Sequence, residues 1–316
     1  MPEFSTPMMK QYQKIREQYQ DCLLFYRSGD FYELFLEDAV VGSQVLDITL
    51  TSRPEGKDGR IPMAGVPYHA VDSYLAKLVK AGYKVAICEQ LSEPNNRGIV
   101  DRDVVRVVTP GTLVDEKALE RKENNYLISL ATDFTTLAIS SADLSTGEVQ
   151  VTQIPYSDQA LASELARLKP KECILSPDCY NNHELLQIIK AEKGINIFPF
   201  WQWEEFASKP DDFLKKHFSL KTLGSFGIED KPQAQKACAT LVGYLRETQK
   251  NHIAHIKKIT LTCPENYLAL DKNSIINLEL FSTLREHDPK GSLLAVLDQT
   301  ETAMGGRLLR RWLAKP

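Results

Sequence analysis

The stretch LLFYRSGDFYELF, residues 23–35, joins a short apolar run to a second aromatic run across a single glycine. Residues 23–26 are continuously apolar and aromatic, which is typical of a buried strand. Ser28 and Gly29 follow at once and indicate a turn. The stretch therefore predicts a strand, a tight turn and the start of a further element.

The element after the turn has two interpretations. Phe31 and Phe35 are four residues apart, and Asp30 and Glu33 have the spacing of a capping box. This pattern predicts a helix over residues 31–46 that Asp30 opens and whose apolar stripe faces a core. The alternative is that the turn presents the Phe31 ring and the Glu33 carboxyl to a partner outside the fold.

Length and composition narrow the classes of protein. The chain has 316 residues, which predicts two or three domains, and a net charge of −4 with a pI near 5.9. That balance gives no basic footprint and argues mildly against nucleic acid or an anionic membrane as a partner. The N-terminus lacks the features of a signal peptide, and no apolar run is long enough to span a bilayer, so we expect a cytoplasmic protein.

The cysteines point to a reduced protein without a metal site. Six are present, and no two have CxxC spacing. Buried thiols are therefore expected rather than disulfides or zinc ligands.

The first part of the chain has an α/β pattern. Thr6 before Pro7 predicts a helix start, residues 71–79 have helical spacing, and residues 84–90 form a strand-like run. The polar stretch RPEGKDGRIP is expected to be a loop. An acidic and lysine-rich segment near residues 113–125 is expected to be a linker.

A second alternation of strands and helices follows. YLISL and TTLAISSADLSTGEVQVTQI predict strands, with a tight turn at residues 145–147. Helix and strand then alternate to about residue 200, and from about residue 234 the pattern is helical. The fold class expected is mixed α/β, in which crossover helices complete the second sheet.

Several long motifs together resemble one family. They are GDFYELF, IPMAGVPYHAVDSYLAKLVKAGYKVAICEQL, VVRVVTPGT, LSTGE, LDKNSIINLEL and GSLLAVLDQTETAMGGRLLRRWL, in this order. The chain resembles the MutS family of bacterial DNA mismatch repair proteins from about Thr6 to its last residue. The resemblance implies a mismatch-recognition domain over residues 1–115, a ribonuclease H-like connector over 116–250, and the beginning of a helical core and lever domain over 251–316.

The resemblance assigns mismatch binding to Phe31 and Glu33, which match the family's Phe-x-Glu. An apolar ring that enters the minor groove unstacks a base step, and this costs less where pairing is already defective. A protonated Glu33 would donate to a purine nitrogen, whereas an ionised one would accept from an imino group. Where no such bond forms, as in undamaged duplex, the negative charge of Glu33 would be penalised.

Four further residues are candidate DNA contacts by the same resemblance. Arg53 and Lys57 would meet phosphate, with a solvated charged loop as the alternative. Met63 would belong to a second groove-side segment, with core filling as the alternative. Asp30 would combine a groove-side position with N-capping as its primary role. Ser28 departs from the family, because many relatives have a bulkier apolar residue there.

The remaining expectations concern activity and partners. The family's P-loop, GxxxxGK followed by Ser or Thr, is absent from this sequence, so no cofactor is expected in the chain and ATP with Mg²⁺ only in the full-length protein. Mismatched duplex DNA, a MutL-like repair protein bound through the connector, and a second copy in the full-length protein are the implied partners. Asp143 raises the alternative of a ribonuclease H type nuclease, but no set of converging acids accompanies it. A protein-interaction module without independent DNA binding is the other alternative, and Arg307, Arg310 and Arg311 are either surface charges or contacts.

Overall fold

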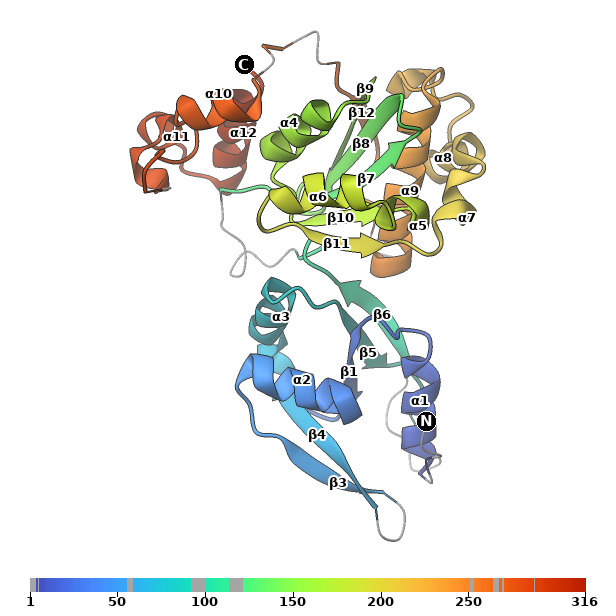
Figure 1. Cartoon of the computed structure of the whole chain (residues 1–316). Helices are drawn as coiled ribbons and strands as arrows, with labels where there is room; N and C mark the ends of the chain where they lie inside the picture. The colour runs from blue at the N-terminus through green and yellow to red at the C-terminus, as the bar shows by residue number, and fades with distance from the viewer. Residues whose placement is uncertain are drawn as a thin grey trace. The chain divides into compact units, whose positions relative to one another are not determined.

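The computed structural model describes residues 4, 6–55, 59–91, 100–113, 122–250, 253–263, 267–268, 270–286 and 288–316. The chain forms two compact units, the first made of residues 1–118 and 246–252 and the second of the remainder. In the described part of the chain, each unit contains one six-stranded mixed sheet with helices on its faces (Figure 1). The predicted mixed α/β class is confirmed.

The first unit has the strand order β3-β4-β2-β1-β5-β6. Its strands are β1 (Leu23–Ser28), β2 (Phe31–Phe35), β3 (Thr51–Glu55), β4 (Gly59–Pro67), β5 (Val85–Gln90) and β6 (Arg102–Val108). Its helices are α1 (Pro7–Arg16), α2 (Leu36–Leu46), the short η1 (Tyr68–Ala70) and α3 (Val71–Lys80). β1 pairs with β5 in parallel and with β2 in antiparallel, so a crossover and a hairpin meet at the centre of this sheet.

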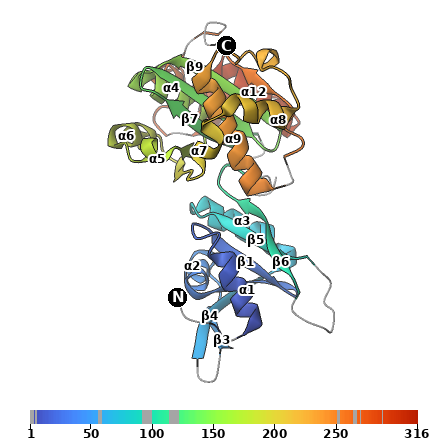
Figure 2. The ribbon, with the colours of Figure 1, turned by 90° about the vertical axis from the view of Figure 1, so that its right-hand side faces the viewer.

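Helices cover both faces of this sheet. Alternate residues of each strand point to opposite sides, so each face offers its own set of side chains for a helix to pack against. On one side, Met9 and Tyr12 of α1 pack with Tyr26 and Phe35 in a buried cluster. On the other side, α2 lies so close that a side chain added at Gly42 would meet Leu34. Figures 1 and 2 show α1 across the sheet from α2 and α3.

Two predictions for this unit are wrong. Residues 31–35 are a strand, and the helix predicted over 31–46 begins only at Leu36. Consequently Asp30 is not an N-cap, since Phe35 occupies that position of α2. The polar stretch expected to be a loop instead supplies residues to β3 and β4, which pair with each other. Because β4 also pairs with β2, hydrogen bonding between distant segments overrides the helical spacing of Phe31 and Phe35.

The second unit has the strand order β11-β10-β7-β8-β9-β12. Its strands are β7 (Tyr126–Thr132), β8 (Thr136–Asp143), β9 (Glu148–Pro155), β10 (Glu172–Leu175), β11 (Asn196–Pro199) and β12 (Ile259–Leu261). Its helices are α4 (Asp158–Leu168), α5 (Pro177–Tyr180), α6 (His183–Ala191), α7 (Trp203–Ala207), α8 (Pro210–Phe218), η2 (Gly224–Phe226), α9 (Pro232–Gln249), α10 (Lys272–Asn277), η4 (Pro289–Gly291), α11 (Leu293–Leu297) and α12 (Ala303–Ala314). The predicted turn at 145–147 lies between β8 and β9, and Gly147 has a φ of +70°. The linker predicted near 113–125 falls mainly outside the described residues.

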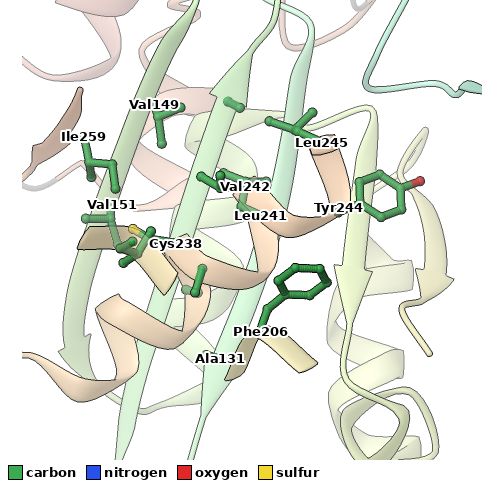
Figure 3. Packing of buried hydrophobic residues seen from close by; sticks show 14 of the residues in the cluster. Ala131, Val149, Val151, Phe206, Cys238, Leu241, Val242, Tyr244, Leu245 and Ile259 are labelled. Carbon is green, nitrogen blue, oxygen red and sulfur yellow. The ribbon is translucent and has the colours of Figure 1, made fainter. Parts of the chain in front are cut away.

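The sheet of the second unit separates two apolar cores. Val149 and Val151 of β9 face Leu241 and Val242 of α9 (Figure 3). The opposite face packs against α4 and α6. A hydrogen bond of 2.7 Å between Ser129 and Thr240 satisfies two buried hydroxyls within the α9 layer.

The helical segment at the C-terminal end of the second unit is held by charged contacts. Arg307 is buried, and it donates to the Glu123 carbonyl at 3.1 Å and to Ser145 Oγ at 2.6 Å. Arg310 pairs with the Glu123 carboxylate at 3.0 Å, and Arg311 pairs with Glu148 at 2.5 Å. The three arginines are therefore contacts within this unit rather than solvated charges. None of the described helices has both the length and the apolar character that a membrane crossing requires.

Candidate nucleic-acid interface

A tight hairpin presents the predicted site residues. Ser28 pairs with Phe31, so the loop between β1 and β2 has only two residues, Gly29 and Asp30. Gly29 has a φ of +58°, which glycine adopts without steric cost. The Asp30 carbonyl accepts a hydrogen bond from the Tyr68 amide at 2.9 Å and ties the loop to the end of β4. The hairpin is therefore fixed at its tip.

The strand places Phe31 and Glu33 on the same side of the sheet, because side chains two apart on a strand point the same way. A helix would have turned them to opposite sides. Phe31 is 48% exposed, whereas Phe35, two residues beyond Glu33 on the same side, is fully buried. The Phe31 ring lies beside Gly65, where an added Cβ would be 3.8 Å from its Cδ1. The interpretation of Phe31 as a core residue is wrong.

Glu33 is partly buried and has charged neighbours. Its Oε2 lies 3.4 Å from Arg53 Nη1. The residue paired with Glu33 on the neighbouring strand β4 is Gly65, so that position contributes no side chain next to the carboxyl group. Burial raises the pKa of Glu33, while Arg53, a hydrogen bond from Ser28 and the charge of Arg102 lower it, and the net direction is upward.

Three of the other predicted contacts are distributed over two strands and a turn. Arg53 lies on β3 on the same side as Glu33, and 37% of its side chain is exposed. Met63 of β4 is only partly buried and packs against the α1 side of the core, which supports its interpretation as a core residue. Asp30 is exposed in the turn. Lys57 lies outside the described residues.

Sequence reasoning missed three contributors to this face. Ser28 donates a hydrogen bond to Glu33, Gly65 leaves the face open, and Arg102 adds positive charge. A hairpin prediction would have indicated the first two, because it places Ser28 and Gly65 beside β2. No local sequence signal indicates Arg102, since it reaches the site only through the pairing of β5 with β6.

Asp143 in the second unit has a structural environment. Its carboxylate accepts hydrogen bonds from Asn124 at 2.8 Å and from the Ser145 amide at 3.0 Å. These bonds hold the turn after β8. Within the described ranges, no three His, Cys, Asp or Glu side chains form a group that could hold a metal ion.

The fold and the site define a two-unit α/β protein in which a half-exposed aromatic ring and a partly buried carboxylate lie on the same side of a hairpin strand. Models of MutS domain I, MutS domain II and MutS domain III match residues 6–117, 125–257 and 273–316 respectively. The chain belongs to the MutS family, as the sequence motifs indicate.

Curated relatives agree with this assignment. The DNA mismatch repair protein MutS of Halothermothrix orenii is 44% identical over 314 residues, which cover 98% of this chain and 35% of the relative. The proteins of the same name from Ruminiclostridium cellulolyticum and Symbiobacterium thermophilum are 45% and 43% identical, with 98% and 100% of this chain covered and 36% of each relative. The chain therefore spans about a third of the length of these relatives.

Proposed function

We propose that this chain recognises mispaired bases in duplex DNA during mismatch repair, and that Phe31 is the wedge. The observation that carries the proposal is the exposure of Phe31 on the same sheet face as Glu33. Exposing a large apolar ring at the tip of a fixed hairpin has no benefit for the fold, because its apolar surface stays in water. Insertion between bases would bury that surface.

The energetics of insertion explain the preference for mispairs. A wedge that enters the minor groove must unstack a base step, at a cost of a few kcal/mol. A mispaired step is already weakened, so less of the binding free energy is spent on deforming it. Sequence is not read directly, and deformability supplies the selectivity.

Glu33 adds a hydrogen bond to the base next to the wedge, and this bond depends on how that base is paired. A carboxylate close to phosphates is repelled unless a base donates a hydrogen bond to it or it takes up a proton. A correctly paired duplex has its imino groups engaged in pairing and offers no such bond. We therefore assign Glu33 mainly to discrimination and only secondarily to affinity.

Contacts with phosphate would supply the affinity that does not depend on pairing. Arg53 uses one nitrogen for Glu33, and a guanidinium has further donors for a phosphate. Lys57 is the second proposed phosphate contact. Asp30 at the turn and the exposed part of Met63 complete the proposed groove-side surface.

The domain roles follow the family assignment. We propose residues 1–115 as the recognition domain, 116–250 as a connector that binds a MutL-like partner, and 251–316 as the beginning of the helical core. We propose that the full-length protein hydrolyses ATP and forms a dimer. No P-loop sequence occurs among these 316 residues, so we assign ATP hydrolysis outside them. The proposed location is the cytoplasm.

The test is a binding competition between duplexes that differ at one base pair. The chain should bind a G·T or single-base-loop duplex more tightly than the fully paired duplex of the same sequence, in a mobility shift at low salt. Equal binding of both would contradict recognition by this chain. It would favour the alternative of an interaction module without independent DNA binding.

A further inference from the structure

The Glu33 carboxyl group is surrounded by hydrogen-bond donors and positive charge. Ser28 of β1 donates a hydrogen bond to it, and Arg53 of β3 lies 3.4 Å away. Arg102 of β6 adds positive charge from the third side. The remaining neighbour, Tyr26, is the ladder partner of Glu33 on β1. Three strands other than its own thus shape the surroundings of this carboxyl group.

The groups act in two different ways. Arg102 is committed elsewhere, because its Nε donates to the Arg27 carbonyl at 2.8 Å and its Nη1 to Gln11 at 3.2 Å. It influences Glu33 only through its charge. Tyr26 directs its hydroxyl to Gln11 at 2.6 Å, away from Glu33. Arg53 lies 3.4 Å from the carboxylate, and a hydrogen bond from Ser28 lowers the pKa of Glu33.

We propose that Ser28 and Arg53 are positioning residues that hold Glu33 as an ionised carboxylate on the same side of β2 as the Phe31 ring. A guanidinium is always a donor, and a hydroxyl that donates completes the coordination of an acceptor. A proton on Glu33 would place a donor among donors and forfeit these bonds. Held in this way, the carboxylate presents an acceptor, which suits an imino or amino group that mispairing has released.

Gly65 is part of this arrangement. It pairs with Glu33 on the strand opposite to β1, and its lack of a side chain leaves the outer side of the carboxylate open. Ser28 on β1 and Arg53 on β3 come from the strands on either side of the β2–β4 pair. The Glu33 side chain keeps 18% of its surface exposed, so part of the carboxyl group stays accessible.

The direction of the effect on protonation follows from the balance of forces. Burial is the largest influence and raises the pKa of Glu33, while Arg53, Ser28 and Arg102 oppose it. Removing the Ser28 hydroxyl leaves burial less opposed, so the pKa of Glu33 should rise further. Ser28→Thr keeps the hydroxyl and should keep the pKa.

The decisive experiment uses the DNA-free chain and does not depend on the proposed function. The Glu33 carboxyl carbon is titrated by NMR, with Glu33→Gln for assignment. The pKa should rise in Ser28→Ala and in Arg53→Gln, and it should stay near the wild-type value in Ser28→Thr. Ser73→Ala, which removes an exposed serine of α3, and Arg60→Gln, which removes a charge from the same β3–β4 hairpin, are the matched controls. An unchanged pKa in both test variants, or an equal rise in the controls, would overturn the inference.

A second arm connects the inference to DNA, and only this arm rests on the proposed function. The ratio of affinities for mispaired and paired duplex is measured across pH for the wild type and Ser28→Ala. The pH at which this ratio changes should move upward by the same amount as the pKa. If the NMR shift occurs and the ratio does not follow it, the positioning inference is supported and the assignment of Glu33 to the base fails.

Discussion

At the residue scale, one strand carries both the proposed wedge, Phe31, and a core phenylalanine, Phe35. Phe31 and Phe35 point to the same side of β2, yet the first is half-exposed and the second is fully buried against α1. Their separation of four positions fits a helical pattern, and the same sequence also fits a strand whose outer end projects beyond the core. Spacing alone could not decide, because short apolar runs are ambiguous between the two periods.

The pair also supplies a matched test of stability. Phe35→Ala should create a cavity and lower the free energy of unfolding by about 3–5 kcal/mol. Phe31→Ala removes mainly solvent-exposed surface and should cost less than about 1 kcal/mol. Urea denaturation, followed by a signal from the first unit, measures the free energy of unfolding of both variants. Similar losses in the two variants would show that Phe31 is a core residue after all.

Gly65 gives a steric test of the open face. A Cβ added there would lie 3.6 Å from the Tyr32 carbonyl and 3.8 Å from the Phe31 ring, which are ordinary contact distances. Gly65→Ala should therefore fold normally. Gly65→Leu should place a branched side chain beside Phe31 and in front of Glu33, and should reduce the preference for mispaired duplex. Full preference in a folded Gly65→Leu variant would show that this side of the sheet does not meet the base.

At the element scale, the β1–β2 hairpin decides what the site can do. A strand brings Phe31 and Glu33 to one side, and the two-residue turn fixes how far they project. The strand β1, the helix α3 and the strand β5 could be predicted because each has a strong local pattern. β2 could not, since its identity depends on pairing with β4, whose residues begin in a stretch that is polar and rich in glycine. The roles of Ser28 and Gly65 were missed for the same reason.

The helix α12 offers a test at the same scale. Arg307 is 8% exposed and bonds the Glu123 carbonyl and the Ser145 hydroxyl. Arg307→Ala removes charge-assisted bonds that contribute about 1.5–3 kcal/mol, so amide exchange in α12 should accelerate about tenfold or more. Hydrogen–deuterium exchange mass spectrometry measures the exchange rate of the α12 amides. Arg285→Ala, which changes an exposed arginine, is the control. Unchanged protection of α12 would mean that these contacts do not hold the helix.

At the scale of the whole molecule, composition is a poor guide to the proposed partner. A net charge of −4 argues against nucleic acid, whereas the family assignment favours it. The conflict disappears if selectivity comes from a wedge and a hydrogen-bond acceptor, because neither requires a basic surface. The lack of a basic surface also predicts that this chain binds duplex DNA with modest affinity, because few phosphate contacts would be available to release counterions.

The most direct measurement combines the wedge with its substrate. Fluorescence anisotropy at low salt compares mispaired and fully paired duplexes of one sequence, for the wild type and for Phe31→Ala. We predict that the wild type prefers the mispaired duplex and that Phe31→Ala loses most of this preference. The affinity for the fully paired duplex, which rests on phosphate contacts, should be nearly the same in the wild type and in Phe31→Ala. An equal preference for the mispaired duplex in both proteins would contradict the assignment of Phe31 as the wedge.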